Sequence, residues 1–198
     1  MAQPAREPTT LRDRAADDLR FIRETMERGA TFTSVPGRGG VVMGAVGLAA
    51  AVVAARQPSP EQWLAVWLGA AVLAFAAGVV AIWKKAGRTG VNLNGRTTQS
   101  FATAVIAPIA AGAGLTFVLW STRTYAAMPA AWLLLYGAGI VAGGAFSVPV
   151  VRIVGAIFMV LGFAAAFTPP AFGNVWLGIG FGGVQIVGGL YIARNHGG

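Results

Sequence analysis

The side chains that could carry out chemistry are few in this chain. It has no cysteine, its one histidine is His196 near the C-terminus, and all seven acidic residues lie at or before Glu61. A catalytic nucleophile needs a base with an orienting partner, and a metal site needs a cluster of ligands. The sequence contains neither pattern. It therefore predicts a protein that is not an enzyme, with no catalytic residue, no metal ligand and no cofactor.

One glycine-rich stretch, GIGFGG at residues 178–183, matches the G-x-G-x-x-G pattern of dinucleotide-binding loops. That pattern binds a pyrophosphate only between a strand and a helix, with an acid following to hold the ribose. Here the stretch lies inside an apolar segment with the length of a helix, and no acid follows it. We therefore interpret these glycines as packing residues.

A second observation supports packing, because one glycine phrase occurs twice in the chain. YGAGIVAGGAF at 136–146 aligns with FGGVQIVGGLY at 181–191. Gly137 and Gly144 are seven residues apart, as are Gly182 and Gly189, so each pair lies on one helix stripe. Small residues at such spacings let membrane helices approach closely. We favour packing within one chain, with an oligomer interface as the alternative. The candidate packing residues are Gly137, Gly139, Gly143, Gly144, Gly178, Gly182, Gly188 and Gly189.

Three other residues would mark a path for a neutral or anionic solute if the protein were a small transporter or channel. Gln185 lies near the middle of an apolar stretch, where an amide needs a hydrogen-bond partner. Pro108 interrupts the hydrogen bonding of a helix. Arg152 could bind an anion, or its side chain could reach the membrane surface. For Gln185 we favour a hydrogen bond between helices, and the solute path is the alternative. Asn174 and Ser147 are predicted to cap helices.

The elements that position these residues are six apolar stretches. The chain is 56% apolar and 11% charged, whereas soluble domains carry about 25% charged residues. A spanning helix needs about 20 apolar residues, which predicts an all-α, polytopic membrane helical bundle with six transmembrane helices. Their approximate limits are 39–55, 62–83, 101–120, 130–148, 152–168 and 174–193.

The segment before the first span has a different character. Residues 1–9 are rich in proline and polar residues, which predicts a disordered tail. Residues 10–29 show an apolar stripe at helical spacing with balanced charges, which predicts an amphipathic helix at the membrane surface or on the cytoplasmic face. Docking of a cytoplasmic partner through residues 11–28 is the alternative.

The spans are predicted to form three two-helix hairpin repeats. Three short connections are each followed by a Trp-Leu pair, at Trp63, Trp132 and Trp176. These tryptophans lie near the span ends, where aromatic side chains anchor helices in the membrane interface. Glu61 lies in the first connection, and its predicted ion-pair partner is Arg56.

The basic residues predict the orientation of the chain. Of the fifteen lysines and arginines, only Arg56 and Arg123 would lie outside if the N-terminus is inside. Basic residues gather on the cytoplasmic side, so both termini are predicted to be cytoplasmic, in the inner membrane of a bacterium. The basic residues lie at span ends rather than in one patch, which argues against nucleic acid as a partner. Four of them are predicted to face anionic lipid: Lys84, Lys85, Arg88 and Arg96.

Three phrases carry a resemblance to known proteins: DLRFIRETMERGATFTSVPGRGG at 18–40, WLLLYGAGIVAGGAFSV at 132–148 and FGGVQIVGGLYIARNHGG at 181–198. With them the chain resembles a group of six-span bacterial membrane proteins of about this length, to which no activity is attached. Its hairpin pattern also resembles the acid-resistance HdeD-like family, which strings together two-helix repeats. Together with the lack of reactive groups, this suggests an accessory, stress-related subunit that packs with itself or with a membrane-complex partner.

Overall fold

The computed structural model describes residue 19 and residues 37–89 and 95–195. Residues 1–9, predicted to be a tail, lie outside this part of the chain. So does the predicted amphipathic helix at 10–29, apart from Leu19, which is exposed. The cytoplasmic docking segment at 11–28 therefore stays a prediction.

The described residues form helices and no β-strand. Six helical segments are long and apolar enough to cross a membrane, which confirms the predicted all-α bundle of six spans. The first five spans are α2 (Gly37–Ala54), α3 (Pro60–Thr89), α4 (Arg96–Ser121), α5 (Met128–Gly144) and α6 (Pro149–Phe167). The last span contains α7 (Gly173–Leu177), the π-helical segment η3 (Gly178–Val184) and α8 (Gln185–Asn195). Short 3₁₀ turns precede two of the helices, η1 (Tyr125–Ala127) and η2 (Pro170–Phe172).

Helix ends follow the local sequence. Pro60 and Pro149 are the first residues of α3 and α6, where a missing N–H leaves no hydrogen bond unmade. α3 continues past the predicted limit of the second apolar span, at 83, to Thr89. α4 begins at Arg96, before the predicted limit of the third apolar span, at 101. Hydropathy finds the apolar part of a helix, whereas lysine and arginine extend the helix beyond it because they are good helix formers.

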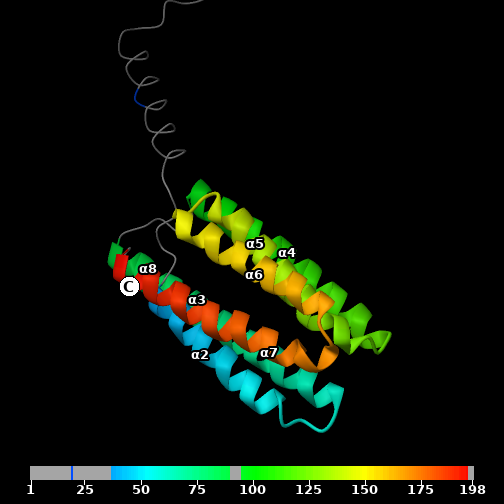
Figure 1. Ribbon diagram of the computed structural model, residues 1–198. Coiled ribbons are helices and arrows are strands. Elements are labelled where there is room, and N and C mark those ends of the chain that lie inside the picture. The colour runs from blue at the N-terminus through cyan, green and yellow to red at the C-terminus, as the bar shows by residue number, and fades with distance from the viewer. Residues whose placement is uncertain (1–18, 20–36, 90–94, 196–198) are drawn as a thin grey trace, which may run out of the picture.

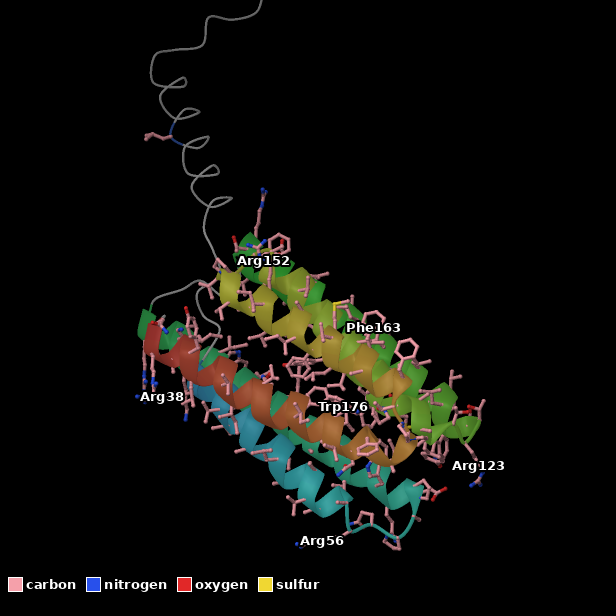
Figure 2. The ribbon with its side chains drawn as sticks, in the orientation of Figure 1. Arg38, Arg56, Arg123, Arg152, Phe163 and Trp176 are labelled. Carbon is pink, nitrogen blue, oxygen red and sulfur yellow. The ribbon has the colours of Figure 1, made fainter. Side chains whose placement is uncertain are left out.

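The spans form two halves that lie against each other (Figure 1). The first half contains α2, α3, α7, η3 and α8, and α2 packs between α3 and the last span. The second half contains α4, α5 and α6, and α5 packs between the other two helices. Arg38 and Arg152 lie at one end of the bundle, and Arg56 and Arg123 at the other (Figure 2). We call these the basic end and the loop end.

The largest buried side chains lie where the halves meet. Leu133, Phe158 and Leu177 are 0% exposed and belong to one cluster, which also contains Trp67 and Ala50. A smaller cluster near the basic end joins Val148, Val151 and Ile192. In contrast, many large side chains of α3 and α4 are exposed, as is expected for helices that face lipid.

The π-helical segment explains an irregularity in the two glycine phrases. Tyr136 follows Trp132 by four positions, whereas Phe181 follows Trp176 by five. The last span thus has one additional residue between its tryptophan and its phrase, and η3 lies over this stretch. A π-helical turn is wider by one residue than an α-helical turn. It can therefore hold the additional residue without rotating the glycine phrase away from its neighbours.

We expect that deletion of Ile179, an exposed residue of η3, leaves a folded protein with a free energy of unfolding within about 1 kcal/mol of the original. Its loss would turn η3 into ordinary α-helix with the spacing of α5. Thermal unfolding of the purified protein measures this. The matched control is deletion of Ala138 in α5. That deletion rotates all following residues of α5 by about 100°, and we expect it to prevent folding. If both deletions lower the free energy of unfolding equally, η3 does not accommodate an additional residue in the last span.

Candidate functional site

The surface between the two halves holds several of the side chains that the sequence singled out, among them Trp63, Trp132 and Gln185. We call it the seam. Among the described residues, it is lined by Trp63, Trp132, Tyr136, Phe158, Phe181 and Gln185.

Asn174 organises the first half beside the seam at the loop end. Its Oδ1 accepts hydrogen bonds from the indole N–H groups of Trp63, at 3.2 Å, and Trp67, at 3.0 Å. Its Nδ2 donates to the carbonyl oxygen of Ala51, at 2.8 Å. One amide thus joins α2, α3 and α7. The prediction that Asn174 caps a helix is wrong, because α7 has no side-chain cap hydrogen bond and the amide is used by other helices.

The tryptophans that open the predicted repeats point into the protein. Trp63 and Trp132 stack across the seam with ring centroids 5.6 Å apart. Trp132 donates to Thr116 Oγ1 at 2.8 Å, and Trp176 donates to Thr168 Oγ1 at 2.8 Å. All three therefore have a polar acceptor inside the fold. Trp83, 67% exposed, is better placed as an interfacial anchor.

Aromatic rings fill the middle of the seam. Tyr136 of α5, Phe158 of α6 and Phe181 of η3 form a triangle with centroid distances of 4.7, 5.1 and 5.3 Å. Rings in tilted and edge-on contact at such distances attract each other beyond the effect of burial alone. Phe181 is the first residue of the second glycine phrase and Tyr136 the first of the other. The two phrases therefore meet at their aromatic ends.

Gln185 lies beside this triangle. The Tyr136 hydroxyl donates to Gln185 Oε1 at 3.4 Å, and Gln185 Nε2 lies 3.9 Å from Met43 Sδ. Its amide therefore bridges α5 of the second half and α2 of the first half, across the seam. The first distance is at the long end of the hydrogen-bond range, and thioether sulfur is a weak acceptor.

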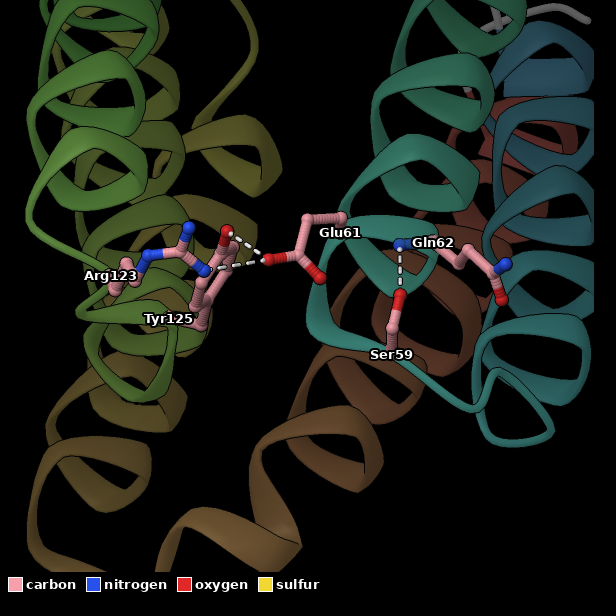
Figure 3. Close-up of polar contacts among 5 residues, drawn as sticks. All are labelled: Ser59, Glu61, Gln62, Arg123 and Tyr125. Carbon is pink, nitrogen blue, oxygen red and sulfur yellow. Dashed lines mark hydrogen bonds and ion pairs between the residues drawn. The ribbon is translucent and has the colours of Figure 1, made fainter.

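Glu61 links the two halves at the loop end of the seam (Figure 3). Its Oε1 accepts a hydrogen bond from Tyr125 at 3.0 Å and lies 3.4 Å from Arg123 Nη1. The predicted pairing with Arg56 is wrong. Arg56 follows α2 and lies apart from Arg123 in Figure 2, whereas Glu61 faces the second half from the first turn of α3. The Arg123 side chain is 81% exposed, and such exposed ion pairs contribute little stability.

The glycines of the two phrases face other helices of the same chain. A Cβ placed on Gly137 would be 2.7 Å from the carbonyl oxygen of Gly155 in α6. A Cβ on Gly189 would be 2.7 Å from the carbonyl oxygen of Gly37, the first residue of α2. The remaining candidates also have neighbours in the chain. Gly144 faces Arg152, Gly139 and Gly143 face Val105, Gly178 faces Ala51, Gly182 faces Leu48, and Gly188 faces Val154.

The three residues of the predicted solute path lie in separate places. Pro108 of α4 lies against Gly139 of α5. Arg152 lies in the first turn of α6, where its side chain is exposed at the basic end (Figure 2). Of the three, only Gln185 has a described contact in the seam. The four residues predicted to face lipid lie at the ends of α3 and α4, where Lys84, Arg88 and Arg96 are exposed and Lys85 is buried.

Sequence reasoning did not identify Tyr136 or Met43 as partners of Gln185, nor Asn174 as the acceptor of two indole hydrogen bonds. The sequence gives only a weak signal for Asn174, a polar residue two positions before Trp176, because its indole partners lie more than a hundred residues away.

Within the described ranges, no group of three or more histidine, cysteine or acidic side chains could hold a metal ion. Comparisons of the chain with family models, with curated proteins and with solved structures found no match. The seam therefore has to be interpreted from its own geometry.

Proposed function

We propose that this multi-pass integral membrane protein is a non-enzymatic packing and interaction module. The observation that carries the proposal is the filling of the seam by Tyr136, Phe158 and Phe181. A transport path needs polar groups along a passage, whereas in the described part of the chain the middle of this seam holds the Gln185 amide and the Tyr136 hydroxyl among aromatic rings. The close backbone approaches at Gly137 and Gly189 add rigidity, because interlocked backbones have little freedom to slide.

Its cellular setting is part of the same proposal. Charge asymmetry supports a bacterial inner membrane with both termini in the cytoplasm, since thirteen of fifteen basic residues fall on that side. We further propose an accessory, stress-related role within a membrane complex or a homo-oligomer. Residues 11–28, whose sequence predicts an amphipathic helix, would supply a docking segment for a cytoplasmic partner. The matching glycine phrases at 136–146 and 181–191 support a repeat of the second hairpin in the third.

A small transporter or channel for a neutral or anionic solute is the second candidate. One observation favours it: the Tyr136 hydroxyl and the Gln185 amide meet in the seam. Polar side chains deep in a membrane bundle often mark substrate paths. The two candidates differ in one measurable property, which is whether water reaches Gln185.

We expect that a Gln185→Cys variant reacts with a membrane-impermeant maleimide at least about tenfold more slowly than a Thr122→Cys variant, because the reagent needs an accessible thiolate. The chain has no native cysteine, and Thr122 is exposed at the loop end. Intact cells or vesicles are labelled and then denatured, so that total thiol is counted in both variants. If the thiol of the Gln185→Cys variant reacts as fast as that of the Thr122→Cys variant, water reaches the seam and the transporter replaces the packing module.

A further inference from the structure

α3 and α4 are joined at both ends but do not pack together between them. At the loop end, Glu61 of α3 contacts Arg123 and Tyr125, which follow α4 (Figure 3). At the basic end, α3 ends at Thr89 and α4 begins at Arg96. Along their length, the described residues of these two helices contact each other at most marginally. This differs from the pairs α5 with α6 and α2 with α8, whose backbones meet at glycines.

The exposed faces of these two helices are strongly apolar. Phe75 of α3 is 60% exposed and Phe117 of α4 is 64% exposed. A Cβ placed on Gly69 or Gly114 would meet no atom within 4 Å. The other exposed large residues include Leu68, Val72, Leu73, Val80, Ile106 and Ile109.

Positive charge is concentrated where these apolar faces reach the basic end. Lys84 and Arg88 are four residues apart on α3 and therefore share one face of the helix. Arg96 is the first residue of α4, and all three side chains are exposed. Trp83 precedes Lys84 and is also exposed, and exposed tryptophan suits the headgroup level of a bilayer. No residue after Glu61 carries a carboxylate side chain.

We propose that this surface, the α3–α4 edge, binds one anionic phospholipid. Its phosphate contacts Lys84, Arg88 and Arg96, and its acyl chains lie along the apolar faces of α3 and α4. The combination of charge and apolar length matches a lipid with a negative headgroup. A second copy of this chain fits less well, because two parallel copies would bring their like-charged ends together. The lipid takes the place of the helix contact that α3 and α4 do not make.

Native mass spectrometry of the full-length protein tests this, with dioleoyl phosphatidylglycerol and dioleoyl phosphatidylcholine as probes. We expect one phosphatidylglycerol to remain bound, and phosphatidylcholine to bind at least about tenfold more weakly. The triple variant Lys84→Gln, Arg88→Gln, Arg96→Gln is expected to weaken phosphatidylglycerol binding about tenfold or more. Glycerol 3-phosphate, which has the phosphate without acyl chains, should not displace the lipid.

The matched control removes three charges from the same end of the bundle but from other helices, as Arg38→Gln, Arg152→Gln, Arg194→Gln. These three arginines are exposed on α2, α6 and α8. We expect this variant to keep its bound phosphatidylglycerol. Equal losses in both triple variants would reduce the effect to general attraction and overturn the site. Equal binding of the two lipids would also overturn the site. Displacement of phosphatidylglycerol by glycerol 3-phosphate would show that the surface binds a phosphate rather than a whole lipid, which contradicts the proposal. Circular dichroism verifies that each variant is folded.

Discussion

Replacing Gly137 with alanine is expected to lower the free energy of unfolding by about 2–3 kcal/mol, as overpacking of a tight contact does. The new Cβ would be 2.7 Å from the Gly155 carbonyl oxygen and 2.8 Å from the Met159 backbone nitrogen. Both atoms belong to the α6 backbone, which cannot change rotamer, so α5 and α6 must separate. Gly189→Ala is expected to act similarly at the start of α2, where the Cβ would be 2.7 Å from the Val41 backbone nitrogen.

Gly69→Ala and Gly114→Ala are the matched controls. Their Cβ atoms would have open space, and alanine is a better helix former than glycine by about 1 kcal/mol. We expect these two variants to be as stable as the original protein or slightly more stable. Thermal unfolding in one detergent compares all four variants. If all four substitutions have the same effect, close backbone approach is not what the glycines provide.

The same variants separate packing within the chain from an oligomer interface. Contacts such as Gly137 with Gly155 join helices of a single chain, so their disruption lowers stability at any protein concentration. An oligomer interface would instead make the loss depend on concentration, by mass action. Native mass spectrometry of Gly137→Ala shows whether the copy number changes. We expect it to stay as in the original protein.

Much of the fold could be predicted because its causes are local. Apolar stretches of about the length that a bilayer requires are visible in the sequence itself, and so are glycines at seven-residue spacing. The pairing of helices could not be predicted. Gly137 and Gly182 occupy matching places in the two phrases, yet one faces α6 and the other Leu48 of α2. The sequence shows that the glycines lie on one face of a helix, but which helix packs against that face depends on the topology of the bundle.

The candidate site was less predictable, for a related reason. Gln185 stands out alone, as an amide in an apolar stretch, so the sequence could nominate it. Its partners Tyr136 and Met43 look like ordinary span residues, and only the packing of α5 and α2 brings them near. The π-helical segment has one sign in the sequence, which is the one-residue difference in spacing after Trp132 and Trp176. The spacing alone does not indicate a π-helix, and η3 in the structure explains it.

Replacing Asn174 with leucine is expected to lower the free energy of unfolding by about 2–3 kcal/mol. Three hydrogen bonds are lost, and a hydrogen bond between membrane helices contributes about 0.6 kcal/mol on average. The substitution also leaves the indole N–H groups of Trp63 and Trp67 and the Ala51 carbonyl without these partners, which adds to the loss. Leucine has the same number of side-chain heavy atoms and the same branching at Cγ, so the substitution removes the amide without leaving a cavity.

Asn195→Leu is the control, since the described hydrogen bond of Asn195 is local, to the Tyr191 carbonyl oxygen at 2.9 Å, and the residue is exposed. A surface change of this kind alters stability by no more than about 0.5 kcal/mol. Asn174→Asp separates the two functions of the amide, because a carboxylate can still accept from both indoles but cannot donate to Ala51. We expect Asn174→Asp to retain part of the stability that leucine loses, as measured by thermal unfolding. If all three variants unfold like the original protein, Asn174 does not hold α2, α3 and α7 together, and the loop end of the first half must depend on apolar packing alone.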